Sequence, residues 1–236
     1  MHGVKALLFD VFGTLADWRG SLARDVPALL APHGIAVDGV AFADAWRAQY
    51  QPAMEEVRAG RIPFSKLDAL HRRNLEIVLR DFGLAQRVDE PLRAQLNLLW
   101  HRLDGWADVA AGLRRLRAKF LLAPCSNGNI ALMANLARHT GWHWDAILGA
   151  EIARDYKPKP AVYLASAAAF DCAPGEAMLV AAHSSDLAAA AAAGLRTAFV
   201  ARPDEYGPAT GEPAPSVPVD VVAGNLLELA DRLGCA

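Results

Sequence analysis

Short apolar runs alternate with amphipathic segments through much of this chain. The apolar runs predict buried strands at 4–8, 120–124, 146–148, 177–181 and 197–200. Segments with apolar residues at steps of three and four predict helices at 109–119, 130–139, 161–170, 187–193 and 226–233. Because strands and helices alternate, the pattern predicts an α/β protein with a doubly wound parallel sheet.

The stretch from 18 to 102 follows a different pattern. Its apolar residues keep a helical period, as at 40–54 and 64–82, and no segment alternates as a strand would. We therefore expect an all-helical cap at 17–105, inserted into a core formed by 1–16 and 106–236. Such an insertion can cover the carboxyl ends of the strands and exclude water from a pocket. The Pro- and Gly-rich stretch 202–218 predicts a loop.

Composition restricts the possible partners. The chain has 236 residues, 53% of them hydrophobic and 21% charged, with a formal net charge of −2. This excludes a disordered protein and provides no basic stripe for nucleic acid or a membrane surface. Three widely spaced cysteines, without metal-ligand spacing, are expected as free thiols. With no secretion signal and no membrane-spanning run in the sequence, we expect a cytoplasmic protein with a small-molecule substrate.

The most informative residue is Asp10, which directly follows the first apolar run. Gly13 breaks that run, so Asp10 is expected beyond the carboxyl end of a buried strand, where parallel α/β sheets place their ligands. A carboxylate at such a position can act as a nucleophile. The alternative is an ordinary residue that starts a turn.

The heptapeptide Phe9-Asp10-Val11-Phe12-Gly13-Thr14-Leu15 resembles the first motif of the haloacid dehalogenase superfamily. The resemblance implies a Rossmann-like core with a helical cap and a nucleophilic Asp10. Phosphatases of the superfamily usually carry a second aspartate where this chain has Phe12, which cannot protonate a leaving group. A halide needs no proton, and Asp-x-Phe-Gly-Thr resembles the 2-haloacid dehalogenase branch. This resemblance places Phe12 and Thr14 at the substrate or halide site.

Ser126-Asn127-Gly128 follows the next predicted core strand and resembles the same branch. Hydroxyl and amide groups at a strand-to-helix junction can bind an anion. The resemblance implies that Ser126 holds the substrate carboxylate and that Asn127 helps to bind the departing halide. Taken alone, the tripeptide favours a plain helix-capping turn, and its order after Asp10 is what favours a binding role.

The segment Tyr156-Lys157-Pro158-Lys159-Pro160-Ala161-Val162-Tyr163 matches the Lys-Pro-x-x-x-x-Tyr pattern of the branch. By that resemblance Lys157 lies beside Asp10, where its charge keeps the nucleophile ionised. Tyr163 would direct its hydroxyl at the same site. The alternatives are a solvated loop lysine and a core tyrosine.

In the cap, Trp46-Arg47 resembles the start of a dehalogenase helix that supplies an arginine to the pocket. A guanidinium there would stabilise the negative charge that develops on the halogen during displacement. Arg47 is the first candidate and Arg19 the second. A surface helix arginine is the alternative for Arg47.

The segment Ala181-Ala182-His183-Ser184-Ser185-Asp186 corresponds to the last motif of the superfamily. It carries one acidic residue where magnesium-dependent phosphatases usually carry two, which predicts a site without metal. We expect Asp186, together with His183, to activate the water that cleaves the ester intermediate. Asp186 could equally cap the alanine-rich helix that follows.

These residues predict a hydrolytic dehalogenase that converts short 2-haloalkanoic acids to 2-hydroxyalkanoic acids through an ester on Asp10, without a cofactor. By resemblance a homodimer is possible. Two other functions remain open: a magnesium-dependent phosphatase or phosphonate hydrolase of the same superfamily, and a catalytically silent member that binds a small acid or a partner protein.

Overall fold

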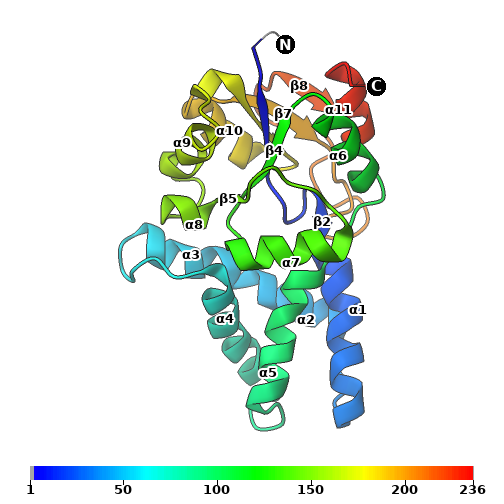
Figure 1. Ribbon diagram of the computed structural model, residues 1–236. Coiled ribbons are helices and arrows are strands. Elements are labelled where there is room, and N and C mark those ends of the chain that lie inside the picture. The colour runs from blue at the N-terminus through cyan, green and yellow to red at the C-terminus, as the bar shows by residue number, and fades with distance from the viewer. Residues whose placement is uncertain (1–2, 236) are drawn as a thin grey trace.

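A six-stranded parallel sheet forms the centre of the protein (Figure 1). The computed structural model describes residues 3–235, so residues 1–2 and 236 of the predicted core lie outside it. The strand order is β5-β4-β1-β6-β7-β8. The strands are β1 (Ala6–Phe9), β4 (Leu121–Ser126), β5 (Leu148–Gly149), β6 (Ala177–Ala181), β7 (Arg196–Val200) and β8 (Val221–Ala223). The predicted fold class is confirmed.

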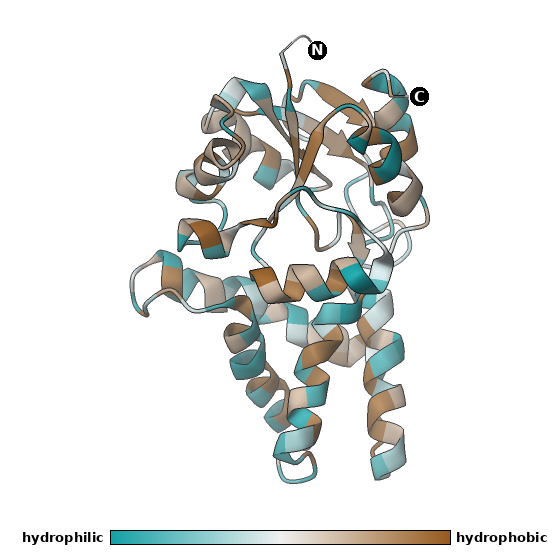
Figure 2. Ribbon diagram, in the orientation of Figure 1, coloured by the Kyte–Doolittle hydropathy of each residue, from teal (hydrophilic) through white to brown (hydrophobic). Residues whose placement is uncertain are grey.

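Helices cover both faces of this sheet, because the central strands β1 and β6 consist entirely of buried apolar residues that point to both sides (Figure 2). In β1, Leu7 and Phe9 pack into one hydrophobic cluster with α6 (Val109–Arg117), α7 (Ile130–Thr140) and α11 (Leu226–Arg232). Ala6 and Leu8 point to the other cluster, which includes α9 (Pro160–Ala168) and α10 (Ser184–Ala192). Two short elements complete the core, α8 (Ala150–Ala153) and the 3-10 turn η3 (Pro174–Glu176).

The segment between β1 and α6 is almost entirely helical, as predicted, and lies beyond one end of the sheet (Figure 1). It contains α1 (Trp18–Leu30), η1 (Ala31–His33), α2 (Gly39–Ala48), α3 (Tyr50–Arg58), α4 (Leu67–Asp81), α5 (Glu90–Asn97) and η2 (Leu98–Arg102). A short antiparallel pair, β2 (Ala16–Asp17) with β3 (Asp104–Gly105), joins its two ends. Strands of two residues leave no periodicity to detect. That the cap is a separate domain at 17–105 stays a prediction.

Two predicted helices differ from the observed ones in ways that matter for the site. The segment predicted as one helix at 40–54 forms two helices that meet at Gln49. Gln49 is the C-cap of α2, and its N–H donates to the carbonyls of Trp46 and Arg47. The helix predicted from 187 begins at Ser184, so His183 is its N-cap and Asp186 lies in its first turn. The alternative interpretation of Asp186 as the N-cap was therefore wrong.

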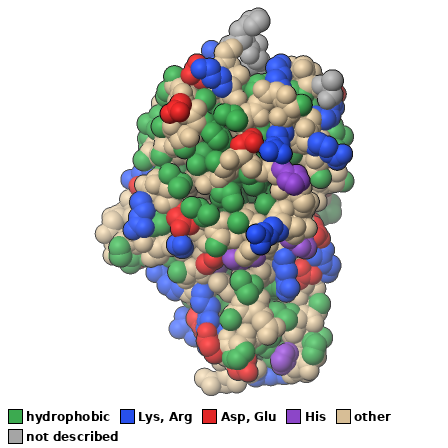
Figure 3. All heavy atoms as spheres, viewed as in Figure 1, with side chains coloured by type: hydrophobic (Ala, Val, Ile, Leu, Met, Phe, Trp, Pro, Cys, Tyr) green, Lys and Arg blue, Asp and Glu red, His purple; other side chains and the backbone are tan. Residues whose placement is uncertain are grey.

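The surface carries acidic and basic side chains intermixed, without a region of one sign on the face in view (Figure 3). No helix among residues 3–235 is long and apolar enough to cross a membrane. The predicted loop after β7 is confirmed, since residues 201–220 contain neither helix nor strand.

Candidate active site

The carboxyl ends of the central strands converge on one cavity of about 420 Å³. Asp10 directly follows β1, Asn127 follows β4 and His183 lies just beyond β6, so neighbouring strands bring these residues together. The cap helices α2 and α3 also contribute residues to the wall of this cavity. The cavity is lined by Asp10, Phe12, Arg47, Tyr50, Gln51, Asn127, Lys157, Pro158, His183, Ser185, Asp186, Tyr206 and Glu212.

One oxygen of Asp10 faces a fixed positive charge. Lys157 Nζ donates to Asp10 Oδ1 at 2.8 Å and to Asp186 Oδ2 at 2.5 Å. The hydroxyl of Tyr163 donates to the other oxygen of Asp186 at 2.6 Å. Burial alone would raise the pKa of Asp10, but the charge of Lys157 and the hydrogen bond from His183 outweigh burial and hold it far below its usual range. Asp10 is therefore an ionised, buried carboxylate.

The second oxygen of Asp10 faces Thr14 and His183. Thr14 Oγ1 donates to Asp10 Oδ2 at 2.6 Å and accepts from the N–H of Ala182 at 2.9 Å. His183 Nδ1 lies 3.1 Å from the same Asp10 oxygen, and its Nε2 lies 2.8 Å from Glu205 Oε2. Burial would lower the pKa of His183, but its hydrogen bonds with the two carboxylates raise it to about 10. At neutral pH the imidazole is charged and bridges Asp10 and Glu205.

Glu205 is the functional candidate that sequence reasoning missed. Its side chain is only 2% exposed, and Trp18 Nε1 donates to its other oxygen at 3.1 Å. Gly13 makes room for this carboxylate, since a Cβ there would lie 2.1 Å from Glu205 Oε1. The residue stands in a Pro- and Gly-rich loop with no periodicity. The one feature of the sequence that points to Glu205 is its position shortly after β7, a core strand whose carboxyl end faces the site.

The cap contributes an arginine and an aromatic wall. The Arg47 guanidinium lies over the rings of Tyr50 and Trp18, at 4.0 and 5.2 Å from their centroids. Within residues 3–235 Arg47 has no ion-pair partner, and its buried Nη1 has no hydrogen-bond partner. Such a guanidinium is suited to an anion. Tyr50, which follows Arg47 by one turn, was not predicted.

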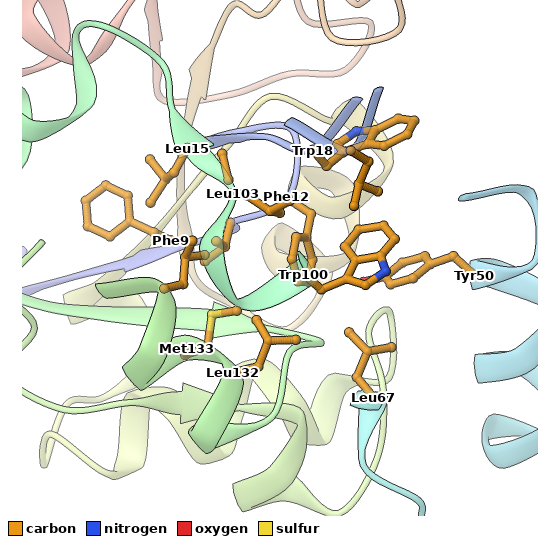
Figure 4. Close-up of a cluster of buried hydrophobic side chains, with 14 of the residues drawn as sticks. Phe9, Phe12, Leu15, Trp18, Tyr50, Leu67, Trp100, Leu103, Leu132 and Met133 are labelled. Atoms are coloured by element: carbon orange, nitrogen blue, oxygen red, sulfur yellow. The ribbon is translucent and has the colours of Figure 1, made fainter. Parts of the chain in front are cut away.

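Phe12 forms the floor between cap and core. It meets Tyr50 and Trp100 edge to face, with ring centroids 6.2 and 5.7 Å apart (Figure 4). Its side chain is only 2% exposed yet reaches the cavity. Position 12 therefore presents an apolar surface beside Asp10 where an acid would otherwise stand.

Of the residues predicted at the substrate or halide site, Phe12, Arg47 and Asn127 line the cavity, whereas Thr14, Arg19, Ser126 and Tyr163 do not. Ser126 is fully buried and absent from the cavity lining, and its Oγ accepts from the N–H of Gly128 at 3.0 Å. Asn127 lines the cavity and accepts the N–H of Lys157 at 2.9 Å through Oδ1. Arg19 is paired with Asp44 at 2.7 Å and does not line the cavity. Substrate or halide binding by Ser126 and Asn127 stays a prediction.

A divalent metal ion, which phosphatases of the superfamily use, does not fit these side chains. Both oxygens of Asp10 and both oxygens of Asp186 already have hydrogen-bonding partners, among them the Lys157 ammonium. Within residues 3–235 no three His, Cys, Asp or Glu side chains are grouped to hold a metal. A cation would have to displace Lys157 to reach Asp10.

Comparison with known proteins agrees with this geometry. The family model of the haloacid dehalogenase-like hydrolases matches residues 4–194. Among solved structures, an L-2-haloacid dehalogenase is 48% identical, with a TM-score of 0.94 over 98% of this chain and 99% of that one. A defluorinating L-2-haloacid dehalogenase is 45% identical, with a TM-score of 0.95 and coverage of 98% and 95%. (S)-2-haloacid dehalogenase 4A of Burkholderia cepacia is 26% identical over 87% of this chain and 88% of its own. The chain belongs to the haloacid dehalogenase-like hydrolases and, within them, to the 2-haloacid dehalogenase branch.

Proposed function

We propose that the protein hydrolyses short 2-haloalkanoic acids to 2-hydroxyalkanoic acids through an ester on Asp10. The observation that carries this proposal is the pairing of an ionised Asp10 with Phe12, an apolar side chain where a proton donor would stand. A nucleophile without an acid beside it suits a leaving group that departs as a stable anion. The similar L- and (S)-2-haloacid dehalogenases support the same substrate class.

In the first step, an oxygen of Asp10 attacks C2 of the substrate and the carbon–halogen bond breaks. Negative charge moves from the carboxylate to the halogen, so a cation on the far side of C2 favours the transition state over the ground state. Arg47 is the candidate, since its guanidinium lines the cavity without a carboxylate partner among the described residues. Asn127 lines the same cavity and assists the halide.

The second step needs a base to activate water, and we assign this role to His183 rather than to Asp186. The oxygens of Asp186 contact Lys157 and Tyr163 rather than Asp10, and ester formation on Asp10 leaves both of these hydrogen bonds in place. His183 Nδ1 points at Asp10, while Nε2 is held by Glu205 at 2.8 Å. The imidazole can take a proton from water attacking the Asp10 ester carbonyl, and Glu205 stabilises the resulting charge. Asp186 then serves to hold Lys157.

The protons balance over the cycle. Ester formation removes the negative charge of Asp10, which lowers the pKa of His183, so the imidazole releases a proton as the halide departs. Neutral His183 accepts a proton from the attacking water and passes it to the leaving alkoxide of the product. The proton left on the regenerated Asp10 carboxyl returns to His183. One proton and one halide are released for each 2-hydroxy acid.

Trapping the ester tests this assignment. Glu205→Gln should release halide in a first-turnover burst equal to the enzyme present, while later turnover falls about 100-fold. Intact-protein mass spectrometry should then show the acyl group on Asp10. The matched control is Asp204→Asn, which changes the neighbouring exposed carboxylate of the same loop and should behave as wild type. Glu205→Gln with wild-type turnover would refute the role of Glu205, and wild-type enzyme without halide release would refute the dehalogenase function itself.

Substrate range can be narrowed by the same assay. We propose that the (S) enantiomer of 2-chloropropionate is hydrolysed with inversion, and that fluoroacetate is a substrate, because a 45% identical structure is described as defluorinating. Chiral chromatography should detect (R)-lactate, and a fluoride electrode should detect fluoride. Chelator should leave both rates unchanged; activity on p-nitrophenyl phosphate that needs magnesium would favour a phosphatase instead. A homodimer and a cytoplasmic location stay predictions.

A further inference from the structure

Arg58 reaches from the cap to the catalytic lysine. It is the last residue of α3, and its side chain is only 10% exposed. Its Nη1 donates to the backbone carbonyl of Lys157 at 2.9 Å. This contact crosses from a cap helix to the core loop between α8 and α9. Arg58 does not line the cavity, so direct contact with substrate does not explain its burial.

The guanidinium is held in place by its own helix. Arg58 Nε donates to Glu55 Oε2 at 2.8 Å, one turn earlier. Nη1 and Nη2 each lie 3.3 Å from Gln51 Oε1, two turns earlier. Gln51 lines the cavity. One side chain therefore links the cavity wall of the cap with the main chain of Lys157.

The main chain of Lys157 is hydrogen-bonded to both the core and the cap. Its N–H donates to Asn127 Oδ1 in the core, and its carbonyl accepts from Arg58 in the cap. The preceding residue is tied to the cap as well, because the Tyr156 hydroxyl donates to the carbonyl of Ser65 at 2.6 Å. The ammonium of Lys157 then reaches Asp10 Oδ1. The main chain that carries this ammonium is thus hydrogen-bonded to the core on one side and to the cap on the other.

We propose that Arg58 is a positioning residue that couples the seating of the cap to the placement of Lys157 against Asp10. The inference rests on the proposed role of Asp10 as nucleophile. When the cap is seated, Arg58 fixes the Lys157 peptide and the ammonium holds Asp10 ionised. When this contact is broken, the Lys157 peptide is no longer held by the cap, and the ammonium can move away from Asp10. The ionised carboxylate is then less stabilised, so the pKa of Asp10 rises.

The test compares Arg58→Met with Arg61→Met. Both remove a guanidinium and keep a flexible apolar stem, but Arg61 is 53% exposed and pairs with Glu56, which lies on the cap as well. For Arg58→Met we expect a roughly 10- to 100-fold lower rate of halide release in a single turnover, because a small displacement of a catalytic group is costly. The acid limb of kcat/KM should move to higher pH. Arg58→Lys should recover part of both effects.

Two further measurements keep the result interpretable. Tyr156→Phe removes the neighbouring cap-core hydrogen bond without touching the carbonyl of Lys157, so it should lower Tm and leave the acid limb in place. Circular dichroism shows whether Arg58→Met is folded. A folded Arg58→Met with the wild-type rate and pH profile overturns the proposal, as does an equal shift of the acid limb in Tyr156→Phe. Absence of halide release from wild-type enzyme would instead reject the proposed function.

Discussion

The two sides of Asp10 are built differently. On the Oδ1 side, Lys157 lies between two carboxylates, and Tyr163 completes the hydrogen bonds of the second. On the Oδ2 side, His183 lies between Asp10 and Glu205. Both sides place a cation between two acids. Burial would lower the pKa of Lys157, but the charges of Asp10 and Asp186 raise it well above its ordinary value, so the ammonium stays charged. The pKa of His183 is raised to about 10 in part by Asp10, so the imidazole can lose its proton once Asp10 is neutralised.

In the mechanism proposed above, this difference assigns the Oδ1 side to ester formation and the Oδ2 side to ester hydrolysis. A permanent ammonium suits a carboxylate that must stay ionised until it attacks. A titratable imidazole suits a step in which a proton must be taken and returned. The following changes test this division, starting with the one that should have the largest effect.

Asp10→Asn should abolish turnover, with at least about a 10⁴-fold loss of kcat, because the amide cannot form the ester. The fold should persist, since the amide keeps the shape of the carboxylate. The companion experiment uses wild-type enzyme in excess over substrate in oxygen-18 water. The product of the first turnover should be unlabelled and the label should enter Asp10; a labelled first product would mean direct attack by water.

Lys157→Met should remove the ion pairs on the Oδ1 side of Asp10 and destabilise the fold. It leaves Asp10 and Asp186 buried without their shared cation, and removing one partner of a buried ion pair costs about 3–5 kcal/mol. Because the charge of Lys157 lowers the pKa of Asp10, its removal should raise that pKa, and protonation should restore part of the lost stability as the pH falls. Urea denaturation at pH 7 and pH 5 checks both statements. A variant equally destabilised at the two pH values would contradict the assignment.

His183→Asn should change the pH dependence of stability on the Oδ2 side. The folded pKa of about 10 lies above the ordinary value of 6.5, so the stabilisation from this group is complete below about pH 6.5 and disappears as the pH rises to about 10. Relative to the variant, wild-type protein should therefore lose stability over that range. Parallel curves for the two proteins from pH 6 to pH 10 would show that folding does not raise the pKa of His183.

Trp18→Phe should have the smallest effect. The substitution removes the hydrogen bond from Trp18 to Glu205, while the contact between Glu205 and His183 remains. Loss of this one hydrogen bond should lower the free energy of unfolding by about 1 kcal/mol. Ester hydrolysis should slow a few-fold, and the halide burst should be unchanged. Equal slowing of both half-reactions would mean that Trp18 shapes the whole pocket rather than the Glu205 side alone.

The sequence singled out every residue described on the Oδ1 side of Asp10 but missed Glu205 on the Oδ2 side; the roles assigned to these residues stay predictions. Asp10, Lys157 and Asp186 stand in motifs of fixed spacing, next to strands whose apolar runs are easily recognised. His183 was found by its motif position. Glu205 was missed because a loop without periodicity gives no clue to where its side chains point. The contact of Arg58 with Lys157 also lies beyond pattern reasoning, because it depends on how the cap sits over the core.

The conformation and surroundings of Gly13 restrict which amino acids positions 13 and 205 can carry together. The residue has a φ of +86°, and its missing side chain leaves the space that the Glu205 carboxylate fills. Two positions at opposite ends of the chain therefore share one volume. In a library that randomises both positions, folded variants with a residue other than glycine at position 13 should carry a shorter residue at position 205. Such variants should still be less stable than the parent protein, because a positive φ disfavours residues other than glycine.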